Sequence, residues 1–281
     1  MTVTRFAPSP TGHLHKGHAY SALEAYSLAK KTDGLFLLRI EDIDHTRCNE
    51  ENTRQILEDL AWLGIEWEEP IRIQSQHLDD YTERAAELER GGFLYPCFCT
   101  RREIQEEIER AGHAPHGSEG PLYPGTCRRL SSDERASRIA GGDPYALRLN
   151  LAAALEKTGP LTWHDAIRGP QAASPELLGD AVIIRKDIGT SYHLAVTVDD
   201  AIQNVTDIVR GVDLFDSTHL HRVLQELLQL PVPTYHHHDL LTDEDGNRLA
   251  KRDRSITLKQ LRESGITAGE LKADLKLPTK N

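Results

Sequence analysis

Near the N-terminus, residues 3–18 read Val-Thr-Arg-Phe-Ala-Pro-Ser-Pro-Thr-Gly-His-Leu-His-Lys-Gly-His. The first four, Val3 to Phe6, are typical of a short strand, and the proline-rich segment after them predicts a turn. From Gly17 to Lys31, apolar residues recur at helical spacing. A strand, a turn and a helix start in this order direct backbone N–H groups and the positive end of a helix to one point, where an anion can bind.

The following segments continue to alternate between strand and helix. Residues 35–40, Leu-Phe-Leu-Leu-Arg-Ile, form a compact apolar run that is typical of a buried parallel strand. Helical patterns occur at 50–63 and at 78–91, the second ending at Gly91-Gly92. This alternation predicts an α/β fold with a doubly wound parallel sheet.

The middle of the chain interrupts the alternation. Residues 95–178 contain a close cysteine pair and a loop rich in Gly, His and Pro, so we interpret them as an insertion. Beyond them, strands are expected at 179–184 and 194–198, and an amphipathic helix at 217–230. The predicted division is a first half of a nucleotide-binding fold (1–94), the insertion (95–178), the second half of that fold (179–235), and a loop with a short helical region (236–281).

Charge and length limit the function classes. The 281 residues are enough for one large α/β unit or two modest domains. The 33 Lys and Arg against 44 Asp and Glu give a net charge of −11, which excludes a generally basic nucleic-acid binder. Residues 41–70, with ten acidic and two basic side chains, have a net charge of −8, whereas 248–262, with six basic and one acidic, have +5. Each segment is either a solvated face or, for the basic one, an anion site.

The sequence contains no signal for a membrane or a secretory route. No apolar run approaches the roughly 20 residues of a membrane span, and the N-terminus lacks a signal-peptide pattern. Four cysteines, two of them separated by one residue, are a poor disulfide framework. We therefore expect a cytoplasmic protein in a reducing compartment, without a membrane partner and with a monomer as the default state.

Two histidines at the expected helix start resemble a known signature. His15 and His18 can both donate to the oxygens of an anion, and Gly17 between them lets a flat group approach the backbone. His15-Lys-Gly-His18 resembles the His-Ile-Gly-His motif of class I aminoacyl-tRNA synthetases. The longer string 6–23, FAPSPTGHLHKGHAYSAL, is similar to the opening of the glutamyl branch of that family.

Three further motifs follow in the order of this family. Residues 38–44, LRIEDID, resemble the strand end after which the glutamyl enzymes place a substrate-binding Glu. Residues 192–200, YHLAVTVDD, with TDIVRG at 206–211, resemble the second half of their nucleotide fold. Residues 249–255, LAKRDRS, lie where the family has Lys-Met-Ser-Lys-Ser. The resemblance implies a class I synthetase Rossmann-like fold with a zinc-bearing insertion and a short helical C-terminal region.

The resemblance also implies an activity. The family joins an amino-acid carboxylate to the α-phosphorus of ATP, which is bound with Mg²⁺, releases pyrophosphate and then transfers the acyl group. By this likeness His15, His18 and Lys251 are the catalytic residues that hold the ATP phosphates, with Arg254 as a further ATP-binding candidate. Arg254 replaces the second Lys of the signature and lacks its compact ammonium group, so Lys251 is the stronger phosphate ligand.

Glutamate, the implied amino acid, has two carboxylates and one ammonium. Arg5 and Arg210 are the candidates to receive the carboxylates, because a guanidinium binds them in bidentate fashion. Glu41 is the candidate for the ammonium. Ser9 and Tyr192 are expected to add hydroxyl contacts.

A second constellation lies in the insertion, where Cys97-Phe-Cys99 is followed by Tyr123-Pro-Gly-Thr-Cys127. Three thiolates can occupy three corners of a tetrahedral zinc site, with a Tyr, a His or water at the fourth; three buried thiols are the alternative. The pattern is similar to the zinc knuckle of the glutamyl family, and in its shortened paralogues the ligands are C-x-C and then Tyr-x-x-x-Cys. His113 and His116 compete with Tyr123, and Cys48 is expected to be a spare thiol.

Length separates the close alternatives within the family. Full-length glutamyl-tRNA synthetases continue into a helical region that reads the anticodon, whereas this chain ends about thirty residues after Lys251. The expectation is therefore the shortened paralogue, which activates glutamate without tRNA and attaches it to queuosine in tRNA(Asp). The alternatives are a truncated enzyme that charges tRNA(Glu), and a catalytically retired RNA-binding protein. The basic segment 248–262 and Arg128, Arg129, Arg135 and Arg138 are candidates for tRNA backbone contacts.

Overall fold

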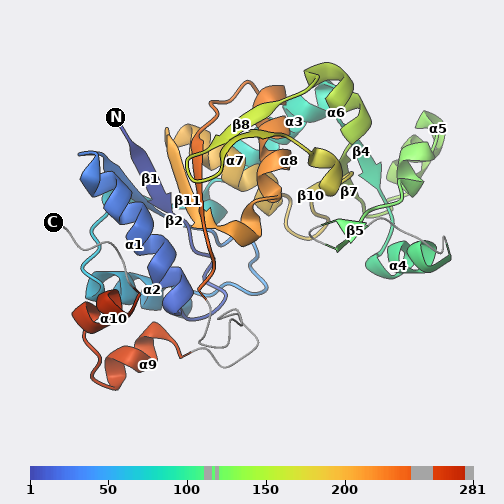
Figure 1. Ribbon diagram of the computed structural model, residues 1–281. Helices are drawn as coiled ribbons and strands as arrows, with labels where there is room; N and C mark the ends of the chain where they lie inside the picture. Colours follow the sequence, from blue (N-terminus) through green and yellow to red (C-terminus); the bar gives the residue numbers. More distant parts are fainter. Residues whose placement is uncertain (111–115, 118–119, 242–255, 276–281) are drawn as a thin grey trace.

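A computed structural model describes residues 1–110, 116–117, 120–241 and 256–275. The first part contains β1 (Val3–Phe6), α1 (Lys16–Lys31), β2 (Leu35–Ile40), α2 (Glu50–Trp62), β3 (Glu68–Ile73) and α3 (Leu78–Arg90) (Figure 1). The middle contains β4 (Leu94–Cys97), α4 (Arg101–Arg110), β5 (His116–Gly117), β6 (Gly120–Pro121), α5 (Ser132–Ala140), β7 (Ala146–Leu149), α6 (Leu151–Thr158), β8 (Thr162–Asp165) and β9 (Gly169–Ala172). The last part contains β10 (Val182–Ile184), α7 (Tyr192–Ile202), β11 (Asp207–Gly211), α8 (Ser217–Leu227), β12 (Thr234–His238), α9 (Leu258–Glu263) and α10 (Ala268–Asp274).

The central strands form two groups, β1-β2-β3 and β11-β12-β8-β9, in which all neighbours run parallel except β8 and β9. The groups meet where β11 lies beside β1, since the N–H of Thr206 donates to the carbonyl oxygen of Val3 (3.0 Å). The strand order therefore reverses between β1 and β11. In a doubly wound sheet, ligands bind at this reversal, outside the carboxyl ends of the strands.

Helix α1 packs against the first group of strands (Figure 1). Its buried side consists largely of alanines with no exposed surface, Ala19, Ala22, Ala25 and Ala29. These small side chains let the helix lie close to β1 and β2. The helix start is thereby fixed beside the end of β1, with the turn 7–14 between them.

The strands predicted at 3–6 and 35–40 are confirmed as β1 and β2, and the helices predicted at 17–31, 50–63, 78–91 and 217–230 correspond to α1, α2, α3 and α8. The strand predicted at 194–198 is wrong, because these residues belong to α7. Every residue from 193 to 200 is buried. An apolar run that is buried on all sides has no periodicity to distinguish helix from strand.

A separate antiparallel sheet, β10-β7-β4, connects the central sheet to helices α4 and α5 at the right of Figure 1. The strand predicted at 179–184 is present only as β10 and lies in this sheet rather than in the parallel one. Conversely, β8 lies within the predicted insertion 95–178 and yet pairs with β12. The division of the chain into domains stays a prediction.

The C-terminal helices α9 and α10 lie beside α2 (Figure 1). The N–H of Leu258 donates to the carbonyl oxygen of Leu14 (2.8 Å), and Lys16 forms an ion pair with Asp274 (2.6 Å). The segment after the predicted phosphate loop is thus attached to the turn before α1. Lys251 and Arg254 themselves lie outside the described residues.

Candidate active site

Two buried arginines lie at the strand reversal. Arg5 is the third residue of β1 and Arg210 the fourth of β11, so both are close to the carboxyl ends of the strands that flank the reversal. Their exposed fractions are 4% and 5%. A guanidinium stays charged even when buried, so this crevice offers fixed positive groups to an anionic ligand.

Asp200 holds Arg5 in place. The Nε and Nη2 atoms of Arg5 donate to its two carboxylate oxygens (2.9 and 3.4 Å), and Nη1 of Arg39 donates to one of them (2.9 Å). Burial opposes ionisation of Asp200, but the two guanidiniums outweigh it and lower its pKa. Within the described residues, Nη1 of Arg5 has no hydrogen-bond partner and stays available to a ligand.

Arg39, which has no exposed surface, connects this pair to Glu41. Its Nη2 lies 3.1 Å from Oε1 of Glu41. Burial raises the pKa of Glu41, and the charges of Arg39 and Arg5 oppose that shift. Because Oε1 alone receives Arg39, the second carboxylate oxygen of Glu41 can accept a further donor.

Arg39 was missed by sequence reasoning, although a signal existed. It is the one charged residue in the apolar strand 35–40, and a charge inside a buried strand requires a partner. The partner lies far away along the chain, at Asp200, so the sequence could indicate that an ion pair was needed but not with which residue.

Tyr192 begins α7 directly after the helix cap Ser191, and its hydroxyl accepts a hydrogen bond from Nη1 of Arg210 (3.3 Å). Burial raises its pKa, with Arg210 and Arg5 opposing and Glu41 and Asp200 adding to the shift. Tyr192 is therefore within electrostatic reach of all four charged groups. Ser9 is exposed in the turn after β1, where the N–H of Glu41 donates to the carbonyl oxygen of Pro8 (3.0 Å). The structure thus gathers Arg5, Glu41, Tyr192 and Arg210, with Ser9 at the rim.

His15 and His18 stack at the start of α1, with ring centroids 3.8 Å apart. The N–H of Gly17 donates to Nδ1 of His15 (3.1 Å), and the N–H of His15 donates to Nδ1 of His18 (3.2 Å). Since both Nδ1 atoms accept, the proton of each neutral ring is on Nε2. The helix cap therefore selects the tautomer in which both rings hold their proton on Nε2, the ring nitrogen that these two cap hydrogen bonds do not use.

The cysteine cluster brings the four predicted ligands together. The sulfur atoms of Cys97, Cys99 and Cys127 lie within 4.8 Å of one another. The hydroxyl of Tyr123 lies 3.4 Å from the sulfur of Cys97 and 3.5 Å from that of Cys99. A tetrahedron with metal–sulfur bonds of about 2.3 Å and a metal–oxygen bond of about 2.0 Å has edges of roughly 3.5 to 3.8 Å. The donor set and its spacing fit a tetrahedral metal ion.

Contacts around the cluster fix its shape. The N–H of Cys127 donates to the Tyr123 hydroxyl (2.9 Å), and the ammonium of Lys186 donates to the carbonyl oxygen of Phe98 (2.9 Å), inside the Cys-x-Cys loop. All four cysteines of the chain are free of disulfides, and Cys48 lies apart from the cluster, as expected of a spare thiol. The placement of His113 and of the His116 side chain falls outside the described residues.

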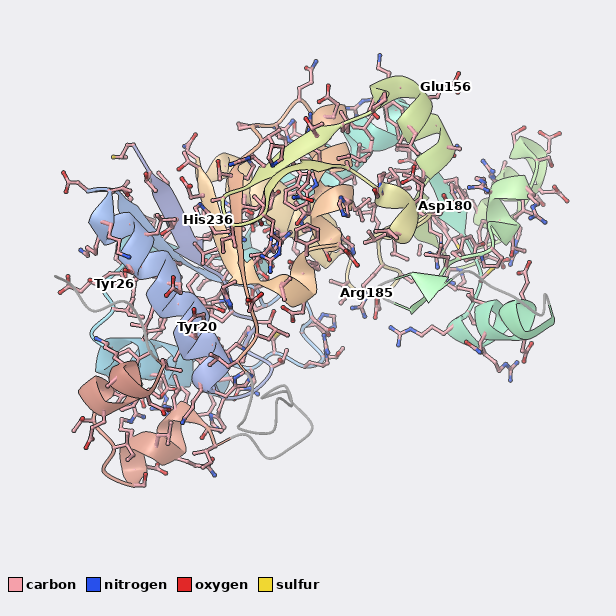
Figure 2. All side chains as sticks on the ribbon, in the orientation of Figure 1. Tyr20, Tyr26, Glu156, Asp180, Arg185 and His236 are labelled. Carbon is pink, nitrogen blue, oxygen red and sulfur yellow. The ribbon has the colours of Figure 1, made fainter. Side chains whose placement is uncertain are left out.

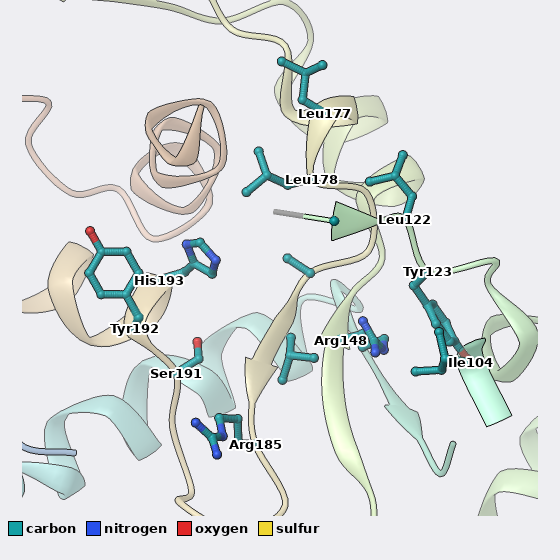
Figure 3. A pocket seen from close by; sticks show the side chains of 13 residues that line it. Ile104, Leu122, Tyr123, Arg148, Leu177, Leu178, Arg185, Ser191, Tyr192 and His193 are labelled. Atoms are coloured by element: carbon teal, nitrogen blue, oxygen red, sulfur yellow. The ribbon is translucent and has the colours of Figure 1, made fainter. Parts of the chain in front are cut away.

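A cavity of about 360 Å³ lies between α7 and the insertion (Figure 3). Ser191, Tyr192 and His193 form one wall, and Tyr123 and Arg148 lie on the opposite side. Arg185, which also lines it, is located between the central sheet and the insertion helices in Figure 2. Through Tyr192 this cavity adjoins the group of charged side chains at the strand reversal.

No helix within the described residues is long and apolar enough to cross a bilayer.

Comparison with known proteins agrees with this geometry. The family model of the catalytic domain of class I tRNA synthetases (E and Q) matches residues 1–273. Glutamyl-Q tRNA(Asp) synthetases of Rhodobacter capsulatus and Symbiobacterium thermophilum are 44% and 42% identical to this chain. The alignments cover 96% and 95% of it, and 98% and 83% of those proteins.

Glutamate–tRNA ligases are also similar, but the chain spans only about half of their length. The ligase of Aquifex aeolicus is 38% identical over 93% of this chain and 54% of its own. A crystal structure of a glutamate tRNA ligase from Elizabethkingia meningosepticum in complex with its amino acid has a TM-score of 0.77 and 30% identity, over 90% of this chain and 52% of that one. The chain therefore belongs to the class I tRNA synthetases of the E and Q group, and is an enzyme of the aminoacyl-tRNA synthetase class of ligases.

Proposed function

We propose that this enzyme activates glutamate with ATP, without needing tRNA, and transfers the glutamyl group to queuosine at the wobble position of tRNA(Asp). The main support is the charge pattern at the strand reversal, where two arginines and one carboxylate complement the two carboxylates and one ammonium of glutamate. The names of the relatives that the chain covers over most of their length support the acceptor.

Each charged group has a donor or acceptor left for the amino acid. Arg5 retains Nη1, and Glu41 retains one carboxylate oxygen. Arg210 has five N–H groups, of which three are used within the described residues. In this assignment the arginines receive the two carboxylates, Glu41 receives the ammonium, and the hydroxyls of Tyr192 and Ser9 complete the shell.

The ATP phosphates are assigned to His15 and His18, whose Nε2 donors point away from the helix cap. Lys251 and Arg254 are assigned to the triphosphate from the segment 242–255, and Mg²⁺ accompanies ATP as part of the substrate. In the first step a glutamate carboxylate oxygen attacks the α-phosphorus and pyrophosphate leaves; in the second, queuosine takes the glutamyl group and AMP leaves. Fixed donors at the phosphates stabilise the charge that builds up during the displacement.

The acceptor nucleoside is assigned to the cavity beside Tyr192. Its walls combine aromatic and apolar side chains with the guanidiniums of Arg148 and Arg185, a mixture suited to stacking a base and pairing with phosphate. Because Tyr192 borders both this cavity and the glutamate site, a nucleoside bound there would lie next to the activated carbonyl group. The metal in the cysteine cluster is assigned as one structural Zn²⁺ with Tyr123 as fourth ligand. We assign the working form as a cytoplasmic monomer.

Two measurements test this function. The purified enzyme is expected to exchange pyrophosphate into ATP when glutamate is present and tRNA is absent, whereas exchange that depends on tRNA would favour the charging of tRNA(Glu). Labelled glutamate is then offered with queuosine-containing and queuosine-free tRNA(Asp). Equal labelling of both would refute the modified base as acceptor, and no exchange under any condition would favour an RNA-binding protein without catalysis.

The glutamate site is tested through Arg5. Arg5→Ala removes the guanidinium at β1 and is expected to abolish glutamate activation while ATP still binds. Retained activation would remove Arg5 from the site. Zinc is tested by metal analysis of protein purified without metal-affinity resin, for which one equivalent is expected and a substoichiometric content would contradict the assignment.

A further inference from the structure

A buried histidine–carboxylate pair stands behind Arg210. His237 lies directly opposite Arg210 in the register of β12 and β11, and Asp165, at the end of β8, approaches His237 from the other side. Neither His237 nor Asp165 has any exposed surface. Burying a carboxylate and an imidazole is costly unless both are fully hydrogen-bonded, so this pair requires an explanation.

The hydrogen bonds determine which nitrogen of His237 holds the proton. Nε of Arg210 donates to Nε2 of His237 (3.0 Å), and because a guanidinium only donates, Nε2 must accept. Nδ1 therefore holds the proton and donates it to Oδ2 of Asp165 (2.7 Å). Asp165 is fixed in turn, since its other oxygen accepts the N–H groups of Ile167 (2.9 Å) and Arg168 (2.8 Å).

The imidazole stays neutral in this position. Burial and the charge of Arg210 lower the pKa of His237 to about 3, although Asp165 acts in the opposite direction. The rings of Trp163, Phe215 and Tyr235 surround it, and the Tyr235 ring lies parallel to it. His237 thus has one rotamer, one tautomer and one charge state at neutral pH.

The consequence for Arg210 follows from a count of its donors. Nε is bound to His237, Nη2 donates to the hydroxyl of Thr218, and Nη1 donates to the hydroxyl of Tyr192. One N–H on each terminal nitrogen is left, and two such groups form a fork that matches a carboxylate. The contact at Nε adds a third fixed point to those at Tyr192 and Thr218, and this third point holds the direction of the fork.

From these contacts we infer that His237, aligned by Asp165, is a positioning residue that fixes the Arg210 guanidinium for a carboxylate of glutamate. The inference rests on the proposed role of Arg210. It adds His237 to the residues that support glutamate binding. His237 does not touch the substrate and acts by holding the direction of the two free N–H groups of Arg210.

Two substitutions separate the contacts on the two sides of the imidazole. Nδ1 faces Asp165, whereas Nε2 faces Arg210 and also the hydroxyl of Thr218 (3.2 Å). His237→Asn places an amide near the former Nδ1, which can still bind Asp165, but removes the acceptor for Arg210. His237→Gln places an amide oxygen near the former Nε2 and keeps that acceptor. A hydrogen bond to a charged group contributes about 1.5 to 3 kcal/mol, so His237→Asn is expected to raise the KM for glutamate by roughly 10- to 150-fold. The KM for ATP should not change, and His237→Gln should recover most of the loss.

The measurement is glutamate-dependent pyrophosphate exchange, with calorimetric titration of glutamate and thermal unfolding for each variant. An unchanged KM for glutamate in His237→Asn would overturn the inference. So would an equal loss, in both variants, of affinity for glutamate, affinity for ATP and thermal stability. A wild-type enzyme that neither binds glutamate nor exchanges would instead overturn the proposed function itself. As a readout that needs no substitution, ¹⁵N chemical shifts should show His237 protonated on Nδ1, and a proton on Nε2 would also overturn the inference.

Discussion

Replacing Glu41 by Gln removes one negative charge from the proposed glutamate site while keeping the size of the side chain. The amide oxygen of Gln can still accept from Arg39, as Oε1 of Glu41 does (3.1 Å), so the buried guanidinium keeps a partner. The substitution removes the negative charge that is proposed to bind the substrate ammonium. A charge-assisted hydrogen bond contributes about 1.5 to 3 kcal/mol, which corresponds to a rise of roughly 10- to 150-fold in the KM for glutamate.

The thermal stability of the Glu41→Gln enzyme should not fall together with its affinity for glutamate. Burial raises the pKa of Glu41 in the folded enzyme, so ionised Glu41 destabilises the fold at any pH above that raised value. Glu41→Gln is therefore expected to unfold at the same or a slightly higher temperature than wild type at neutral pH. The gain should disappear as the pH falls below the pKa of Glu in the unfolded chain, where both forms are neutral.

The assay is the KM for glutamate in pyrophosphate exchange as a function of pH, together with thermal unfolding. In the wild type the KM should rise as the pH falls through the raised pKa of Glu41, whereas the Gln variant should lack this rise; the substrate's own carboxyl groups titrate in both. Glu66→Gln makes the same chemical change at an exposed position and serves as the control. A Glu41→Gln enzyme with wild-type KM would refute the assignment of the ammonium, and one that unfolds several degrees lower would refute the reasoning on burial.

Three other substitutions test separate parts of the structure. Arg39→Met leaves the carboxylates of Asp200 and Glu41 without this buried partner and should cost about 3 to 5 kcal/mol in the free energy of unfolding by denaturant, whereas Arg54→Met, at an exposed ion pair, should cause no measurable change. Cys99→Ser, or a chelator, should lower the thermal stability of the insertion and the labelling of tRNA while glutamate-dependent exchange persists; equal loss of both would contradict a purely structural metal. Arg185→Ala should reduce transfer to tRNA at unchanged exchange, and a normal transfer rate would exclude the cavity as acceptor site.

The elements that the sequence predicted have either clear boundaries or a periodic signal. Val3–Phe6 and Leu35–Ile40 are short strand-forming segments bounded by turn residues or by a charged strand end, and α1 has apolar residues that recur at helical spacing. Residues 194–198 were misassigned because α7 is buried on all sides. The periodicity of apolar residues in a sequence reflects the contrast between a buried and an exposed face of the helix. A helix without an exposed face has no such contrast.

The supporting residues of the site were less predictable than those proposed to contact glutamate. Glu41, Tyr192 and Arg210 lie inside motifs of the family, and Arg5 directly precedes one, so resemblance pointed to them. The roles of Asp165 and His237 depend on the pairing of β8 with β12, which brings these residues, 72 positions apart in the chain, within 2.7 Å of each other. Neighbouring side chains of the His-His-His segment at 236–238 alternate between the faces of β12, which separates His237 from His236 and His238.

The buried charges explain how the proposed site for an amino acid with two carboxylates can exist before the amino acid binds. Arg5 and Arg39 would repel each other if unpaired in a crevice with little solvent, but Asp200 receives both, and Glu41 receives Arg39 a second time. The proposed ligand contacts are the atoms that this network leaves over: Nη1 of Arg5, one oxygen of Glu41, and the fork of Arg210. Binding would then require no rearrangement of the guanidiniums, because they are already held by protein carboxylates and, at Arg210, by His237. Selectivity for glutamate over glutamine would follow from the same arrangement, since an amide in place of the side-chain carboxylate would bring a second donor against a guanidinium that can only donate.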